Sequence, residues 1–262
     1  MTLRVTAICN LKGGVGKSTT VINLAAVLAR DYKKRVLLID ADCQCNTTEF
    51  FGGQPERGNV ARVLRHAGSQ GDPGQFAAGQ IQPTVMDGID LLAAEDSLMD
   101  LDLTKAETGT ADASVLQKLT RTVREKYDVI LIDCPPAFNA ASAAALIAAH
   151  DVILPIKLDA FALRGMTNMM RQISNMQALN PRLQVAGVLP TMWYKDKLIL
   201  DSEEQLSKAG MRLYPHIRYS RPVDRMTFEQ EPLCVSSPRS GAGKDYRLFA
   251  AAYMEEGKNY GL

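Results

Sequence analysis

The sequence predicts an α/β protein with a doubly wound, mainly parallel sheet that carries helices on both faces. Short β-branched runs recur along the chain, and segments with helical periodicity separate them. The runs are continuously apolar rather than alternating, which is typical of strands buried on both faces of a parallel sheet. Right-handed crossovers are then expected between successive strands. The predicted strands are residues 5–9, 36–39, 129–132, 152–156 and 185–189, with a further strand near 211–213.

The composition favours one large domain that spans residues 1–262. Of the 262 residues, 46% are hydrophobic and 23% are charged, which is enough apolar material for one sizeable core. Residues 52–88 are rich in Gly, Gln and Pro and predict a soft surface region with one short helix near 59–66. Too little apolar sequence precedes this region for a separate core, so we expect it to belong to the single domain.

Charge and hydropathy limit the classes of partner. The net charge of +1 gives no global attraction to nucleic acid or to an anionic membrane, so either contact needs a local patch. No apolar stretch reaches the roughly 20 residues of a membrane span. The first predicted strand begins near the N-terminus and leaves no room for a signal peptide. We therefore expect a soluble, cytoplasmic protein.

The five cysteines lack the paired spacing of a structural zinc site, and an odd number does not suggest a disulfide framework. Small core residues are the simplest interpretation for most of them. Cys43 and Cys45 lie close together beside a predicted active site, so a redox or metal role is kept as the minor alternative.

A glycine-rich segment between the first strand and the first helix predicts a phosphate-binding loop. Glycines let the backbone adopt positive φ and approach the phosphates, so that amide N–H groups and the helix N-terminus face the anion. Lys17 would reach the β- and γ-phosphates, and the Ser18 hydroxyl would be a ligand of Mg²⁺. The alternative, a glycine turn with two solvated lysines, does not account for the strand before the loop and the helix after it. The predicted nucleotide contacts are Lys12, Gly13, Gly14, Val15, Gly16, Lys17, Ser18 and Thr19.

Three acids follow apolar strands at the edge of the sheet where ligands bind in such folds. Asp40 and Asp42 end the second strand and share one side of it, because alternate residues of a strand point the same way. Asp133 closes a later strand directly before Cys134-Pro135-Pro136 and is expected to organise Mg²⁺. As an alternative, Asp40 and Asp42 could cap a following helix.

The loop resembles the deviant Walker A motif, K-G-G-x-G-K-[ST], of the ParA/MinD family of P-loop ATPases. Leu11 stands where the general P-loop has glycine, and the extra lysine is Lys12. The resemblance implies that Lys12 reaches the ATP of the second subunit in an ATP-dependent homodimer. It also implies that Asp42 orients the attacking water and that Asp40 supports the magnesium shell. Cys43 and Cys45 replace the family's usual Pro and Gly after Asp42.

The same resemblance implies slow hydrolysis of MgATP, with ATP and Mg²⁺ as cofactors and Lys12, Lys17 and Asp42 as the catalytic residues. No Ser-His-Asp set and no Cys-His pair is evident. The family places adenine between two loops that follow late strands. The corresponding candidates here are Pro190, Met192, Pro215 and Ile217.

The C-terminal region resembles the DNA-binding region of ParA proteins, which implies sequence-independent DNA binding by the ATP dimer and an association with the nucleoid. A ParB-like activator or an adaptor protein is the implied partner. Acidic residues interrupt this region, and Gly241 stands where the family has arginine, so a merely solvated face is the alternative. The candidate DNA contacts are Arg218, Arg221, Arg225, Arg239, Lys244 and Arg247.

Other members of the superfamily fit the sequence less well. A MinD-like protein needs a basic amphipathic tail, whereas residues 249–256 are small and acidic, so no membrane partner is expected. Tyr246, Tyr253 and Tyr260 repeat every seven residues, as in a tyrosine kinase tail, but this spacing also packs one helix face. A nucleotide-gated adaptor that positions a protein complex without DNA remains the main alternative function.

Overall fold

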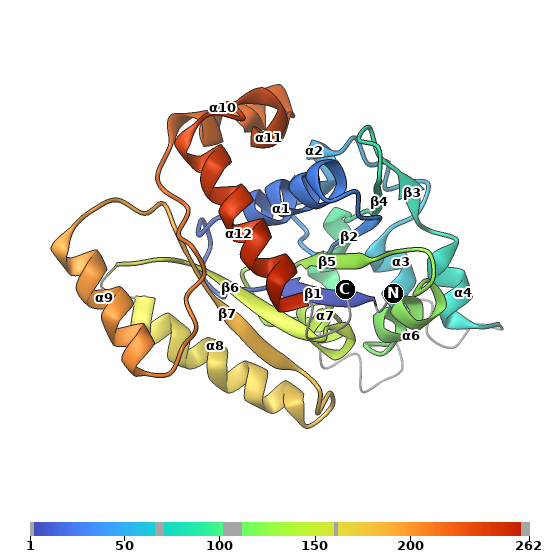
Figure 1. Cartoon of the computed structure of the whole chain (residues 1–262). Coiled ribbons are helices and arrows are strands. Elements are labelled where there is room, and N and C mark those ends of the chain that lie inside the picture. The colour runs from blue at the N-terminus through green and yellow to red at the C-terminus, as the bar shows by residue number, and fades with distance from the viewer. Residues whose placement is uncertain (1–2, 66–70, 102–111, 160–161, 258–262) are drawn as a thin grey trace.

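The computed structural model describes residues 3–65, 71–101, 112–159 and 162–257 of the chain (Figure 1). Seven strands form one sheet in the order β3-β4-β2-β5-β1-β6-β7. Every neighbouring pair is parallel except β3 and β4, which confirms the predicted mainly parallel sheet. The strands are β1 (Arg4–Ile8), β2 (Val36–Asp40), β3 (Gln82–Pro83), β4 (Ile89–Leu92), β5 (Val129–Asp133), β6 (Asp151–Lys157) and β7 (Gln184–Thr191).

Helices cover both faces of the sheet because the central strands are apolar on both sides. On β1, Val5 and Ala7 belong to the core on one face, whereas Ile8 belongs to the core on the other. The first face is covered by α3 (Val60–Arg65), α6 (Val115–Thr122), α7 (Ala140–Ala148) and α8 (Ala162–Gln177). The second face is covered by α1 (Lys17–Asp31), α2 (Asn46–Phe50), α11 (Leu233–Ser236) and α12 (Gly241–Gly257).

The glycine-rich region 52–88 contributes side chains to the main core. The short helix predicted near 59–66 is α3, and its Val60, Val63 and Leu64 are fully buried. The region also contains α4 (Pro73–Ala78) and the edge strand β3, and a short 3-10 helix, η1 (Asp96–Asp100), follows β4. Residues 66–70, which include part of the predicted helix and soft stretch, lie outside the described part of the chain.

The strand predicted near 211–213 is reduced to a single bridge between Leu213 and Val188 of β7. The chain reaches it through α9 (Lys197–Lys208) and continues into α10 (Arg221–Glu229). Helix α12 then crosses the sheet alongside α1 (Figure 1). Tyr246 and Tyr253 on α12 are buried, which fits a packed helix face, and Tyr260 lies outside the described residues.

A buried arginine connects β1 with β6 and with the C-terminal helix α12. Arg4 on β1 is fully buried and donates to Asp151 on β6 over 2.7 Å and to the Tyr253 carbonyl of α12 over 2.7 Å. Its guanidinium also lies 3.9 Å from the centre of the Tyr253 ring.

Within the described residues, no helix is long and apolar enough to cross a membrane.

Candidate functional site

The loop between β1 and α1 has the backbone conformation that its glycines allow. Gly14 and Gly16 have φ of +68° and +83°, in the left-handed region that a side chain disfavours. Gly16 is the N-cap residue of α1 and carries no side chain to cap it, so the first amides of the helix point into the loop. With no acid in the first turn of α1, this end of the helix favours an anion.

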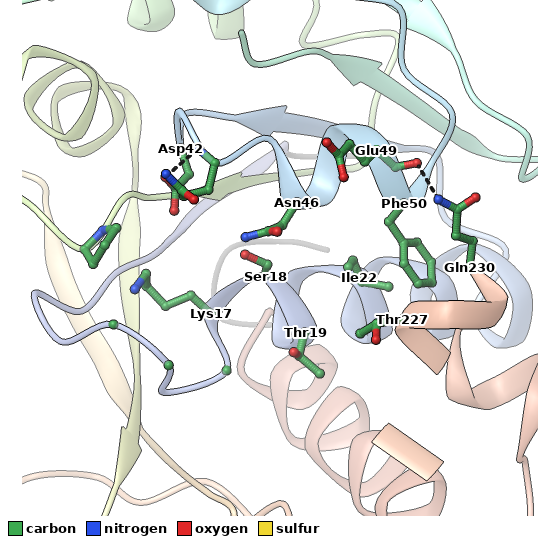
Figure 2. A pocket seen from close by; sticks show the side chains of 15 residues that line it. Lys17, Ser18, Thr19, Ile22, Asp42, Asn46, Glu49, Phe50, Thr227 and Gln230 are labelled. Carbon is green, nitrogen blue, oxygen red and sulfur yellow. Dashed lines mark hydrogen bonds between the residues drawn. The ribbon is translucent and has the colours of Figure 1, made fainter. Parts of the chain in front are cut away.

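A cavity of about 520 Å³ opens over this loop. Figure 2 shows Lys17, Ser18, Asp42 and Asn46 around one part of it, and Phe50 with Gln230 at the other end. Lys17 is only 6% exposed, and its ammonium donates to the Lys12 carbonyl over 3.1 Å. The predicted phosphate contacts Gly13, Gly14, Gly16, Lys17, Ser18 and Thr19 all line the cavity, whereas Val15 is buried beneath the loop.

Lys12 forms an ion pair with Asp159, which follows β6 in the same chain. The side chains are 39% and 32% exposed, respectively, so the pair lies at the surface beside the loop. Asn10 holds the start of the loop, because its side-chain oxygen accepts from the Lys12 amide and its amide donates to the Pro155 carbonyl. Neither Asp159 nor Asn10 was among the predicted site residues. The only signal for Asn10 in the sequence is a polar residue directly after the predicted strand 5–9.

Asp40 and Asp133 lie side by side at the carboxyl ends of β2 and β5. Both are fully buried. Burial, together with the charge of Asp133, raises the pKa of Asp40 to about 8. Burial likewise raises the pKa of Asp133 to about 6, although the Thr47 and Ser18 hydroxyls and the Lys17 ammonium oppose this rise. The two acids therefore form a pair that retains one proton near neutral pH.

The oxygen atoms of these acids differ in what they can still bind. Asp40 is saturated, since it accepts from the Thr48 amide and hydroxyl over 2.8 Å each and from the Asp42 amide over 3.2 Å. Asp133 accepts from the Thr47 hydroxyl through Oδ2, but its buried Oδ1 has no hydrogen-bond partner in the described part of the chain. A buried carboxylate oxygen near the Ser18 hydroxyl fits the oxygen ligands of Mg²⁺. Asp40 is better placed to support the loop that carries Asp42.

Asp42 lines the cavity and is 4% exposed. The loop after it keeps a left-handed residue, Cys45, with φ of +55°, at the position where the resembled family has glycine. Cys45 thus adopts a left-handed backbone conformation that glycine would favour. Directly after it, Asn46 begins α2 and lines the cavity. The altered loop residues leave Asp42 beside the phosphate loop.

The thiols of Cys43 and Cys45 are partly exposed. Burial and the nearby charge of Asp40 raise the pKa of Cys45 to about 12, so this thiol stays protonated at neutral pH. Among the residues with described positions, no group of three or more His, Cys, Asp or Glu side chains could hold a metal ion. The thiol chemistry of Cys45 is therefore unlike that of a reactive redox cysteine.

A second, smaller cavity of about 60 Å³ adjoins the loop at Gly16 and Thr19. Of the predicted adenine contacts, Met192 and Ile217 line it, together with Tyr246 of α12. Pro190 is buried and acts through its carbonyl, which accepts from the Ile217 amide over 2.8 Å, whereas Pro215 is exposed and does not line the cavity. Beside this cavity, the ring of Trp193 stacks on His216 with centroids 3.7 Å apart and planes 6° apart.

The geometry agrees with comparisons to known proteins. A family model described as "AAA domain" matches residues 3–185. The "Chromosome-partitioning ATPase Soj" of Thermus thermophilus is 38% identical over 257 residues, which cover 96% of this chain and 96% of that protein. The chain belongs to the Soj/ParA family of P-loop ATPases. The predicted resemblance is thereby confirmed.

Solved structures show the same fold beyond the Soj/ParA relatives. Apo McdA from Cyanothece superposes with a TM-score of 0.82, covers 96% of this chain and 99% of that chain, and is 21% identical. Cobyrinic acid a,c-diamide synthase from Mycobacterium smegmatis, with bound ADP and magnesium, has a TM-score of 0.78 at 27% identity. That match covers 98% of this chain and 96% of that chain. The seven-stranded Soj/ParA fold is thus shared with enzymes of other chemistry.

The basic residues predicted from the Soj/ParA resemblance fall into two groups. Arg218 pairs with Asp245, Arg225 pairs with Glu229, and Arg247 pairs with Asp31. The other group is exposed and has no ion pair among the described residues: Arg221, Arg239 and Lys244. The structure therefore brings the candidates to one C-terminal region, but it neutralises half of their charge within the chain.

Proposed function

We propose that the chain is an ATP-driven switch that binds MgATP, dimerises around it and hydrolyses it, and that it positions DNA or another cargo by ATP-dependent, sequence-independent DNA binding. The observation that carries this proposal is that Lys17 and Asp42 line one cavity over the phosphate loop, while Lys12 lies at the surface beside that loop. Membership of the Soj/ParA family supports an ATPase that acts in partition or positioning. The finer steps rest on the geometry described above.

The residues around the cavity fit hydrolysis of a phosphoanhydride without a covalent intermediate. The loop amides and Lys17 would bind the phosphates, and Asp42, which lines the same cavity, would orient a water molecule beside the terminal phosphate. Ser18 and the free oxygen of Asp133 would hold Mg²⁺, which would neutralise charge on the phosphates. Asp133 must be ionised to hold the cation, so the acid pair would have to give up the proton that it retains.

Dimerisation is proposed to depend on a change of partner by Lys12. In the single chain, its ammonium is paired with Asp159 at the surface. A partly exposed pair is weak, worth about 0–1 kcal/mol, so the triphosphate of a second subunit can compete for the lysine. The switch would then require both nucleotide and a second copy of the chain.

For DNA, the supporting feature is a set of exposed cations, Arg221, Arg239 and Lys244, that form no ion pair within the described residues. Such local cations can attract phosphates even though the net charge of the chain is only +1. A nucleoid location would follow from such binding, and a ParB-like protein would act as the activator. The internal pairing of Arg218, Arg225 and Arg247 favours the second candidate, a nucleotide-gated adaptor that positions a protein complex without DNA.

ATP turnover by the purified chain, measured with and without DNA, tests the proposal. We expect slow hydrolysis that requires Mg²⁺, and DNA binding that needs ATP and weakens with salt. DNA binding that is insensitive to nucleotide would overturn the switch. ATP hydrolysis and dimerisation in the absence of any DNA binding would favour the adaptor.

A further inference from the structure

Arg218 donates three hydrogen bonds to one carboxylate, that of Asp245. Its guanidinium donates to Asp245 through Nε over 2.7 Å and through Nη2 over 2.8 Å. Its own backbone amide donates to the same carboxylate over 3.0 Å. Asp245 is only 4% exposed, whereas the Arg218 side chain is 51% exposed. This bidentate, charge-assisted arrangement is stronger and more directional than a single-contact surface pair such as Lys208–Glu204.

The backbone of Arg218 belongs to the wall of the second cavity. On either side of it, Ile217 and Tyr219 bond to the β7 edge, since the Ile217 amide donates to Pro190 and the Tyr219 amide donates to Trp193. In an extended segment the intervening amide points the opposite way, so the Arg218 N–H is turned toward α12, where Asp245 accepts it. Asp245 therefore joins the cavity wall to α12.

Three consecutive residues of α12 face three different surroundings, because each helical residue is rotated by about 100° from the last. Lys244 is exposed and forms no ion pair within the described residues. Asp245 is buried against Arg218, and Tyr246 is buried and lines the second cavity. One turn of α12 thus connects the cavity, the Arg218 segment and the exposed Lys244.

The P-loop is connected to the same wall from the other side. Thr191, at the end of β7, donates its hydroxyl to the Val15 carbonyl over 2.9 Å, and it lines the second cavity. A continuous series of hydrogen bonds therefore runs from the phosphate loop through the end of β7 to Arg218, and from Arg218 to α12.

Gly241 leaves the space that this arrangement needs. A methyl group on Gly241 would lie 2.4 Å from Cδ and 2.9 Å from Nε of Arg218, well inside contact distance. The arginine side chain crosses the glycine on its way to Asp245. A larger residue at position 241, including the arginine that the family resemblance leads one to expect there, would push Arg218 away from Asp245.

We infer that Arg218 is a positioning residue rather than a DNA contact: with Asp245 it forms a latch, accommodated by Gly241, that couples occupancy of the second cavity to the placement of the N-terminal turn of α12, which carries Lys244. The inference rests on the proposed function in that the second cavity receives part of the nucleotide and the α12 surface receives DNA. It assigns the ion pair a signalling role between these two sites.

The effects of two substitutions on ATP affinity and DNA affinity distinguish the latch from a direct DNA contact. If the latch exists, Arg218→Gln and Asp245→Asn both weaken binding of a fluorescent ATP analogue, by about threefold to tenfold, because each removes a charge-assisted hydrogen bond. The double variant is then no weaker than the worse single variant, since both changes remove one interaction. In turnover assays, KM for ATP rises while kcat at saturating ATP stays near the wild-type value.

A direct contact predicts different signs. Asp245→Asn would then release a cation and strengthen DNA binding, Arg218→Gln would weaken it, and ATP affinity would be unchanged in both variants. That set of results overturns the latch. Lys208→Gln, which breaks an exposed ion pair with Glu204 on α9, is the matched control and should leave ATP affinity unchanged.

Gly241→Arg gives a second route to the same measurement without altering either partner of the ion pair. We expect Gly241→Arg to weaken binding of the ATP analogue as Arg218→Gln does. Arg218→Lys should weaken it as well, because lysine lacks the planar guanidinium that bonds both oxygens of Asp245. Wild-type ATP affinity in both Gly241→Arg and Arg218→Lys would also overturn the latch. If the affinity changes occur but no protein binds DNA, the latch stands and the proposed DNA binding fails.

Discussion

Lys12 pairs with Asp159 of its own chain, at the surface beside the phosphate loop. The family's dimer would need the same ammonium to point across the subunit interface. In the proposed dimer, Lys12 would therefore have to give up Asp159 before it could contact the ATP of the second chain.

Replacing Asp159 should make this exchange easier. For Asp159→Ala we expect ATP-dependent dimerisation to strengthen by about twofold to fivefold, the equivalent of a partly exposed ion pair of roughly 0.5–1 kcal/mol. Sedimentation with a slowly hydrolysed ATP analogue measures the effect. Lys12→Ala, which removes the cation itself, should abolish the dimer. A dimer that is weaker in Asp159→Ala than in wild type would show that Asp159 has a different role.

Asp42 is predicted to act in hydrolysis and not in binding. It lines the cavity, and within the described residues its carboxylate accepts a hydrogen bond only from the nearby Gln44 amide. Asp42→Ala should bind ATP, lose turnover by about 100-fold or more, and accumulate as a dimer. Lys17→Ala, by contrast, should lose nucleotide binding. Equal turnover of Asp42→Ala and wild type would remove Asp42 from the mechanism.

The buried acids predict a falling stability with rising pH in the nucleotide-free protein. The pKa of Asp40 is raised to about 8 by burial and by Asp133, from an ordinary value near 4. Between these values the folded state keeps a proton that the unfolded state has lost, so the free energy of unfolding decreases as pH rises from about 4 to 8. Thermal melting across this range should show the decrease, and Asp40→Asn should flatten it. An unchanged slope in Asp40→Asn would assign the retained proton elsewhere.

Cys45 occupies a backbone conformation that suits glycine. Its φ of +55° costs a non-glycine residue about 1 kcal/mol, which the greater freedom of glycine in the unfolded chain partly offsets. We expect Cys45→Gly to raise the free energy of unfolding by about 0.5 kcal/mol, measured by denaturant titration. Cys43→Gly, at a position with ordinary φ, should lower it. A destabilised Cys45→Gly would mean that the packing of the thiol outweighs the backbone term.

Arg4 is expected to be the most sensitive charged residue outside the site. Arg4→Ala would leave the fully buried Asp151 without its cation, which costs about 3–5 kcal/mol. Chemical denaturation of Arg4→Ala and of Arg4→Met combined with Asp151→Asn tests this, because the double variant removes both charges and should recover much of the loss. Lys208→Ala, which breaks an exposed pair with Glu204, should cost about 1 kcal/mol at most, the size of a surface ion pair.

The parts of the fold and site that the sequence predicts are those set by local patterns. The strand cores and the order of strand, glycine loop and helix are visible in neighbouring residues, and so are the acids at strand ends such as Asp133. Residues that act through distant contacts were missed. Asp159 meets Lys12 across 147 positions, and Thr191 meets Val15 across 176, so no local pattern reveals either contact.

The predicted surface residues show the same limit in a different form. The sequence predicts that Arg218 is a free cation, but in the structure it forms an ion pair with Asp245 of α12. Similarly, the strand predicted near 211–213 has the right composition, yet only Leu213 pairs with β7. Whether an apolar run becomes a strand at a sheet edge depends on the partner available to it.

The stack of Trp193 on His216 has a practical consequence. Trp193 is the only tryptophan in the sequence, and it directly follows Met192, which lines the second cavity. Its indole therefore emits from one place, between the end of β7 and the segment that carries Arg218. Ligands that rearrange either segment should shift or quench this emission, so the unlabelled chain carries its own optical reporter of occupancy.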